Sequence, residues 1–185
     1  MPLPESIQFA TRRLCVVPAA DRHIDDLLAV NGDEETTRFL PYPAWASRED
    51  GLAWLSRMNA LAEAGATRQL VLTLSDSGRA IGTLLLFKHD EGSRRLEVGY
   101  VLGRPHWGLG YMREALAAAC EHAFSELSCR RLEAEVNPDN IASCRLLERL
   151  GFRQEGRLRQ RWTAKGRSYD TLFYGLLADD PRPGR

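Results

Sequence analysis

The apolar and polar positions of this chain follow two rhythms along its 185 residues. Some runs are rich in apolar and β-branched residues and stop at turn residues, which predicts strands. These runs lie at 8–17, 69–74, 79–87, 96–102, 131–136, 152–162 and 169–177. Other runs repeat apolar side chains at helical spacing, which predicts helices with one buried face. They lie at 21–30, at 31–40, from the capping residue Ser47 to Gly65, from near Leu109 onward, and at 140–150.

The order of these elements predicts a mixed α/β chain: a strand, helices, three strands, a helix, a strand, a helix and two strands. Turn residues agree with this order, since Asp76-Ser77-Gly78 is typical of a hairpin and Pro41-Tyr42-Pro43 of a helix end. We expect a single domain over 1–178 and a disordered tail over 179–185, which contains two prolines.

Composition narrows the classes of partner. The 25 basic and 25 acidic residues leave a formal charge of zero, so the overall field does not favour nucleic acid. No apolar run is long enough to span a bilayer, and the N-terminus has no signal-peptide pattern, which predicts a cytoplasmic protein without a membrane partner. The four cysteines lack CxxC spacing and the histidines are scattered, so we expect reduced thiols and no metal site.

A glycine-containing loop, Pro105-His106-Trp107-Gly108-Leu109-Gly110-Tyr111, separates a predicted strand from a predicted helix. Backbone N–H groups at a helix start lack partners inside the helix, and the helix dipole adds positive potential, so such a loop can bind an anion. A tight turn is the other reading. Dinucleotide binding is excluded, because Arg113 stands where a third glycine is needed, and the chain contains no Gly-Lys-Ser or Gly-Lys-Thr for a nucleotide-hydrolase loop.

Several separated motifs then occur in one order along nearly the whole chain. They are Glu97-Val98-Gly99-Tyr100-Val101-Leu102, Trp107-Gly108-Leu109-Gly110-Tyr111 with Glu114-Ala115, Asn137-Pro138-x-Asn140-x-x-Ser143, and Leu150-Gly151-Phe152. With these motifs the chain resembles the GNAT superfamily of N-acetyltransferases, and within it the RimJ/RimL-type branch that acetylates protein α-amino groups. The resemblance implies a single mixed, mostly antiparallel sheet of six or seven strands, splayed between the fourth and fifth strands, with helices on both faces.

The resemblance also implies that the chain binds acetyl-CoA as its acetyl donor. The backbone amides of the glycine loop are expected to bind the pyrophosphate, and the strand edge and the Asn-Pro motif to bind the pantetheine arm. The candidate cofactor-binding residues are Gly108, Leu109, Gly110, Tyr111, Met112 and Arg113 in the loop, Tyr100, Val101 and Leu102 on the strand, and Asn137, Asn140 and Ser143 beside the splay. Asn140 fits equally well as a helix cap.

Acetyl transfer requires a neutral amine and a proton for the departing sulfur. Glu97 is the candidate base, directly or through water, and a solvated strand carboxylate is the alternative reading. Many members of the superfamily protonate the sulfur with a tyrosine, but Leu147 occupies that position here, and Ser143 is the expected substitute. An alkyl thiol is a fair leaving group, so a weak hydroxyl donor suffices, although helix capping also explains Ser143. No neighbouring histidine supports a covalent role for Cys144.

The acceptor is the least constrained part of the interpretation. A protein N-terminus or a small amine both fit, because an α-amine is substantially neutral near pH 7 and needs less help from a base. The pocket is expected from 31–64 and 160–169, where Tyr42, Trp45 and Trp162 are candidates for stacking on the acceptor. A homodimer is compatible with the sequence. A regulator that binds acyl-CoA without turnover stays open as the alternative function.

Overall fold

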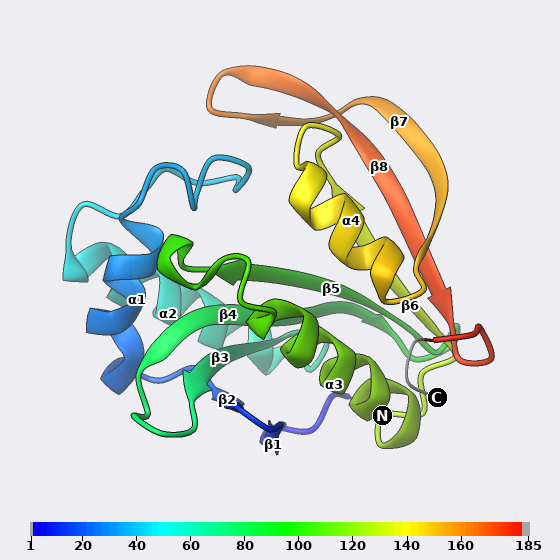
Figure 1. The fold of residues 1–185 in the computed structure, drawn as a ribbon, viewed down its shortest axis with the longest axis horizontal. Coiled ribbons are helices and arrows are strands. Elements are labelled where there is room, and N and C mark those ends of the chain that lie inside the picture. The colour runs from blue at the N-terminus through cyan, green and yellow to red at the C-terminus, as the bar shows by residue number, and fades with distance from the viewer. Residues whose placement is uncertain (1, 183–185) are drawn as a thin grey trace.

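The computed structural model describes residues 2–182, and its strands form one eight-stranded sheet in the order β1-β2-β3-β4-β5-β6-β8-β7 (Figure 1). The strands are β1 (Phe9–Ala10), β2 (Leu14–Pro18), β3 (Arg68–Leu74), β4 (Ala80–Asp90), β5 (Arg95–Leu102), β6 (Arg131–Val136), β7 (Arg153–Ala164) and β8 (Arg167–Leu177). The α-helices are α1 (Ile24–Asn31), α2 (Arg48–Glu63), α3 (Tyr111–Ser125) and α4 (Ile141–Arg149). Neighbouring strands are antiparallel except β5 and β6, which confirms the predicted mixed sheet.

The sheet has eight strands instead of six or seven because the first predicted strand, 8–17, is divided. It turns back on itself at Thr11, so that β1 and β2 pair with each other through Phe9 and Val16. The Thr11 amide donates to the carbonyl oxygen of Leu14 at 2.8 Å, and the Thr11 hydroxyl accepts from the Leu14 amide at 3.1 Å. These local hydrogen bonds replace the continuous ladder that the composition suggested.

The predicted helix over 31–40 is wrong. Helix α1 ends at Asn31, and the following segment consists of turns. The side chain of Asp33 accepts a hydrogen bond from the Thr36 amide at 2.8 Å, and the Thr37 hydroxyl donates back to the Asp33 carbonyl at 3.1 Å. Side chains that bond to nearby backbone in this way compete with helix formation. The segment is an irregular loop above α1, near the tip of the β7–β8 hairpin (Figure 1).

The helices cover both faces of the sheet, as expected. Alternate residues of β3 show the two faces, since Val71 packs in one apolar cluster with α1 and α2, whereas Leu70 and Leu72 pack in the larger cluster with α3 and α4. Small residues such as Ala115 and Ala119 are fully or nearly buried on α3, which lets this helix lie close to the sheet. Helix α3 begins at Tyr111, two residues after the expected start at Leu109.

The sheet is splayed between β5 and β6, which are the fourth and fifth strands of the sequence-based count. Their pairing runs only from Arg95 to Glu97 on β5, although β5 continues to Leu102. The expected splay is therefore confirmed. The N-terminus of α4 and the Asn-Pro motif follow β6 directly, so both lie where the two strands separate (Figure 1).

The first residues of the tail pack against the body of the protein, in contrast to the predicted disorder. Arg153 pairs with Asp180 at 3.0 Å, and the Arg182 guanidinium lies 4.5 Å from the centre of the Phe124 ring. The remaining tail residues, 183–185, lie outside the described range. Within 2–182, the structure contains no helix that is both long and apolar enough to cross a membrane.

Strand β7 forms one edge of the sheet, and its side chains are mostly exposed. The register of its pairing with β8 shifts between Leu158 and Trp162, where Gln160 has a positive φ of 49°. At the far end of the hairpin, Lys165 donates from Nζ to the carbonyl oxygen of Thr37 at 2.8 Å. The hairpin is thereby joined to the irregular loop after α1.

Candidate active site

The glycine loop leads from β5 into α3 through a short 3₁₀ turn at Arg104–His106. Gly108 and Gly110 have φ angles of +72° and +80°, and Gly110 is the N-cap of α3. These conformations favour glycine because a Cβ would crowd the backbone. The two glycines therefore define a specific turn, from which the first N–H groups of α3 point outward at the helix start.

Six consecutive amides at this turn lack a hydrogen-bond acceptor among residues 2–182. They belong to Gly108, Leu109, Gly110, Tyr111, Met112 and Arg113. The first amide of this region with an acceptor is that of Glu114, which donates to the Gly110 carbonyl at 3.1 Å. Free amides at a helix N-terminus satisfy the oxygens of an anion and add the positive end of the helix dipole. The geometry thus meets the requirement for binding a phosphate group.

A cluster that the sequence analysis did not interpret holds this loop against the turn between β1 and β2. Glu114 accepts hydrogen bonds from the Thr11 hydroxyl at 2.6 Å, from the Arg13 amide at 2.8 Å and from Arg13 Nε at 2.7 Å. The Arg13 guanidinium also donates to the Leu109 carbonyl at 2.9 Å and stacks 4.3 Å from the Tyr111 ring centre. Burial would raise the pKa of Glu114, but these hydrogen bonds outweigh it and lower the pKa.

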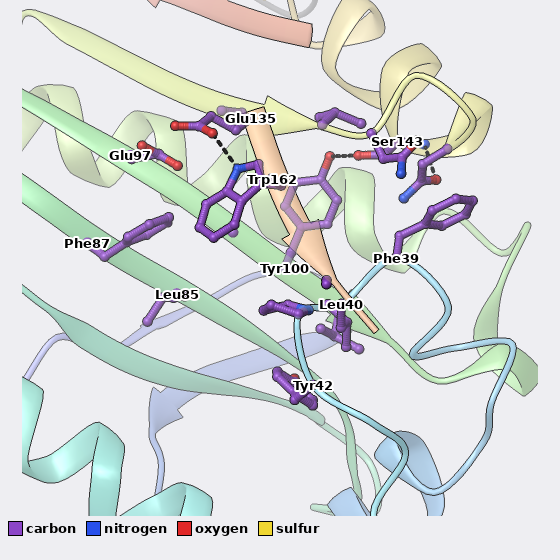
Figure 2. Close-up of a pocket in the computed structure, with 18 of the residues that line it drawn as sticks. Phe39, Leu40, Tyr42, Leu85, Phe87, Glu97, Tyr100, Glu135, Ser143 and Trp162 are labelled. Carbon is purple, nitrogen blue, oxygen red and sulfur yellow. Dashed lines mark hydrogen bonds between the residues drawn. The ribbon is translucent and has the colours of Figure 1, made fainter. Parts of the chain in front are cut away.

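At the splay, side chains from β5 and α4 meet. The hydroxyl groups of Tyr100 and Ser143 lie 2.7 Å apart in one hydrogen bond (Figure 2). Asn140 caps α4, because its Oδ1 accepts from the Ser143 amide at 3.2 Å. Asn137 accepts from the Asp139 amide at 2.9 Å, which shapes the turn after β6. The Leu102 carbonyl, in contrast, already accepts from the Trp107 indole at 2.6 Å.

A cavity of about 450 Å³ opens at this splay and extends over the sheet face covered by α2 (Figure 2). Most of its lining is apolar or aromatic, with side chains that include Tyr42, Leu85, Phe87, Tyr100 and Trp162. This size is typical of small-molecule sites. The cavity brings together six of the predicted site residues, namely Glu97, Tyr100, Val101, Asn137, Asn140 and Ser143. The glycine loop lies outside the lining, toward the start of α3.

Glu97 is buried, with its side chain 4% exposed, and it is ion-paired, so it is not a solvated strand carboxylate. Lys88 Nζ donates to Glu97 at 2.8 Å and to Glu135 at 3.1 Å. Glu135, whose side chain is 6% exposed, also accepts from the Trp162 indole at 2.7 Å (Figure 2). Burial raises the pKa of Glu97, although Lys88 acts in the opposite direction. A raised pKa makes this carboxylate a stronger proton acceptor.

Sequence reasoning missed Glu135 and Lys88. The signal for Glu135 was present, because Glu133 and Glu135 alternate with apolar residues on the short strand β6 and therefore share the face of Glu97. Among the aromatic candidates, Tyr42 and Trp162 line the cavity, whereas Trp45 is 7% exposed and packs against Trp54 in the core.

Comparisons with known proteins agree with this geometry. Residues 13–153 match the family model described as an acetyltransferase (GNAT) domain. An uncharacterized N-acetyltransferase, p20 of Bacillus licheniformis, is 31% identical over 90% of this chain and 94% of its own length. The [ribosomal protein uS5]-alanine N-acetyltransferase of Escherichia coli is 35% identical over 48% of this chain and 45% of its own. Mycobacterium smegmatis RimJ in complex with CoA-disulfide is similar in fold, with a TM-score of 0.83 at 23% identity, covering 95% of this chain and 88% of that one.

Proposed function

Because the chain belongs to the GNAT acetyltransferase family, we propose that it moves the acetyl group of acetyl-CoA to a primary amine by direct attack in a ternary complex. The main support for this proposal is the row of six amides at the start of α3 that have no acceptor among residues 2–182. These amides lie next to the splay between β5 and β6, where a cavity of about 450 Å³ has room for an amine. No hydrolase or nucleotide-loop motif competes for this site.

The donor site in this proposal has two parts. The amides from Gly108 to Arg113 bind the pyrophosphate, since they offer hydrogen bonds without a resident acceptor. The backbone of Tyr100 and Val101 along the open edge of β5 binds the pantetheine arm, with Asn137 and Asn140 across the splay. Leu102 continues this edge, and its carbonyl oxygen accepts one hydrogen bond from Trp107, which leaves one lone pair for the pantetheine arm.

The acceptor nitrogen attacks the thioester carbonyl carbon, and the carbon–sulfur bond breaks. Glu97 accepts a proton from the amine, directly or through water, and its burial keeps it basic enough for this task. Ser143 donates a proton to the departing sulfur and thus replaces the tyrosine that is absent at Leu147. Tyr100 supports Ser143 through the 2.7 Å hydrogen bond between their hydroxyl groups.

The finer assignment of the acceptor is a protein N-terminal α-amino group. The similarity to RimJ/RimL-type enzymes supports it, as does the uS5-alanine activity stated for the E. coli relative. An α-amine is also partly neutral at pH 7, so a single buried carboxylate is a sufficient base. We place the protein in the cytoplasm, in line with its four free cysteines.

Two measurements test the proposed function. Acetyl-CoA at a hundredfold excess over its dissociation constant is expected to raise the free energy of unfolding by about 2.7 kcal/mol, which a thermal shift detects. Release of free thiol from acetyl-CoA is then followed with a panel of amines and peptides that have free N-termini. Absence of stabilisation would refute the donor site. Stabilisation without turnover on any acceptor would instead identify a regulator that binds acyl-CoA.

A further inference from the structure

We propose that the acceptor is a primary amine that carries a single positive charge next to an apolar group, and that polyamines are rejected. This inference rests on the proposed acetyltransferase function and names the class of its second substrate. It is derived from the distribution of charge between the inner end and the rim of the cavity, and from the apolar surface between them.

The inner end of the cavity carries more negative than positive charge at contact distance. The carboxylates of Glu97 and Glu135 are both buried, and they share one ammonium group, that of Lys88. Arg161 comes only within 3.8 Å of Glu135 and is 49% exposed, so solvent screens most of its charge. Buried carboxylates require compensation by cations, and the ammonium group of an acceptor supplies it at this point.

The wall between the inner end and the rim is apolar. Leu85 and Phe87 on β4 line the cavity together with Tyr42 from the loop after α1 (Figure 2). All three side chains are partly buried, so part of their apolar surface stays available to an acceptor. The Trp162 indole donates to Glu135, so its ring is held beside the carboxylates. Burial raises the pKa of Tyr42 to about 12, so its hydroxyl stays neutral. A chain or ring of carbon atoms attached to the amine is favoured here by the burial of apolar surface.

The rim of the cavity carries the opposite charge. Its lining includes three exposed cations, Arg38, Arg57 and Lys165. Arg38 pairs with the exposed Glu35 at 3.3 Å, and Lys165 donates to the Thr37 carbonyl, so within residues 2–182 Arg57 is the member of this group without an acidic or carbonyl partner. Asp170, also in the lining, is paired with Arg157 at 2.8 Å and so offers little to an incoming cation. A second ammonium group at the far end of an acceptor would lie among these cations and be repelled.

Proton balance is consistent with entry of the acceptor as an ammonium ion. The ammonium loses one proton to Glu97, and the neutral nitrogen then forms the bond to the acetyl carbon. The departing sulfur takes the hydroxyl proton of Ser143, and the second proton leaves the nitrogen as the amide forms and restores that hydroxyl. The products are the amide, free CoA thiol and one proton released to solvent from Glu97.

A matched pair of amines tests the charge rule. Hexylamine and 1,6-diaminohexane have the same carbon chain and differ by one ammonium group. We expect kcat/KM for hexylamine to exceed that for the diamine by only about fivefold, because the rim cations are exposed and solvent screens part of their repulsion of the second ammonium group. Arg57→Gln should narrow this ratio. The second arm uses two peptides with a free N-terminus that differ only at the second residue, which is leucine in one and lysine in the other. We expect a higher kcat/KM for the leucine peptide. Comparison of the peptides with hexylamine shows whether the acceptor is a protein N-terminus or a small amine.

A variant tests the inner end. Glu135→Gln should raise KM for hexylamine about tenfold and leave KM for acetyl-CoA unchanged, since only the amine meets this carboxylate. Equal or faster acetylation of the diamine, or an unchanged KM for hexylamine in Glu135→Gln, would overturn the inference while the acetyltransferase function stands. Binding of acetyl-CoA without acetylation of any amine would overturn the function, and this inference with it.

Discussion

Removing the carboxylate of Glu114 should release the glycine loop from the sheet and weaken both folding and cofactor binding. In the wild-type protein Glu114 accepts three hydrogen bonds from Thr11 and Arg13, and Arg13 in turn donates to the Leu109 carbonyl. Glu114→Ala leaves those donors without an acceptor and frees the guanidinium that fixes the loop. The same change therefore perturbs two properties that can be measured separately.

The magnitude follows from the geometry. The hydrogen bonds from the Thr11 hydroxyl and the Arg13 amide are part-buried, and each contributes about 1 kcal/mol net. The Arg13 side chain is 39% exposed, so screening limits its ion pair to less than about 1 kcal/mol. The total is about 2 to 3 kcal/mol, which for a chain of this length lowers the melting temperature by roughly 4 to 12 °C.

The pH dependence of this loss has a definite sign. The pKa of Glu114 is lower in the folded protein than its ordinary value of 4.5, so its stabilisation is fully present above 4.5. It is lost as the pH falls through the lower folded-state pKa. The difference in free energy of unfolding between the wild type and Glu114→Ala should therefore be constant near neutral pH and close in acid.

Thermal melts from pH 3 to pH 8, together with calorimetric titration of CoA, measure both effects. We expect binding of CoA to weaken about tenfold, equivalent to about 1.4 kcal/mol needed to reorder the loop. Glu63→Ala, which removes an exposed carboxylate near the end of α2, is the matched control and should change neither quantity. A melting temperature within 1 °C of the wild type, or an unchanged affinity for CoA, would refute the reasoning.

Three further predictions concern the donor site and the catalytic groups. Gly108→Ala and Gly78→Ala should each lower the free energy of unfolding by about 1 kcal/mol, because both glycines have positive φ and open space around the added Cβ. Only Gly108→Ala should reduce the thermal shift that CoA produces, since Gly78 lies outside the glycine loop. In a pH–rate profile, kcat/KM should fall as the pH drops through the raised pKa of Glu97, and Glu97→Gln should remove this step; an identical profile in the variant would exclude Glu97 as the base. Ser143→Ala should lower kcat about a hundredfold with little change in KM for acetyl-CoA. An unchanged kcat would show that Ser143 has a structural role at the start of α4 and no catalytic one.

Periodicity was sufficient for most of the fold, because strands and helices with one buried face repeat their apolar residues in register with their own geometry. It failed where side chains bond to nearby backbone. Thr11 turns the first strand back on itself, and Asp33 with Thr37 holds the segment after α1 in turns. A hydrophobic pattern carries no information about such local polar contacts.

The site was predictable where one motif builds it and obscure where distant residues meet. The glycine loop and the cap of α4 are each contained in a few consecutive residues. The pairing of Lys88 with Glu97 and Glu135, by contrast, depends on an irregularity in the β4–β5 pairing, and on a positive φ of 50° at Lys88. Neither feature is visible in the sequence. From the sequence alone, Glu97 therefore fitted a catalytic base and a solvated strand carboxylate equally well.

Strand β7 limits how two copies of this chain can associate. A free strand edge is a template for pairing with another strand, and a symmetric antiparallel pairing places residues that lie equally far on either side of its axis opposite each other. With the axis at Arg159, Arg159 would face its own copy and Arg157 would face Arg161 of the other copy, and like charges directly opposite are destabilising. The shift in register near Gln160 interrupts the ladder as well. Pairing of two β7 edges in this register is therefore disfavoured, and a hairpin left unpaired in this way stays accessible at the cavity.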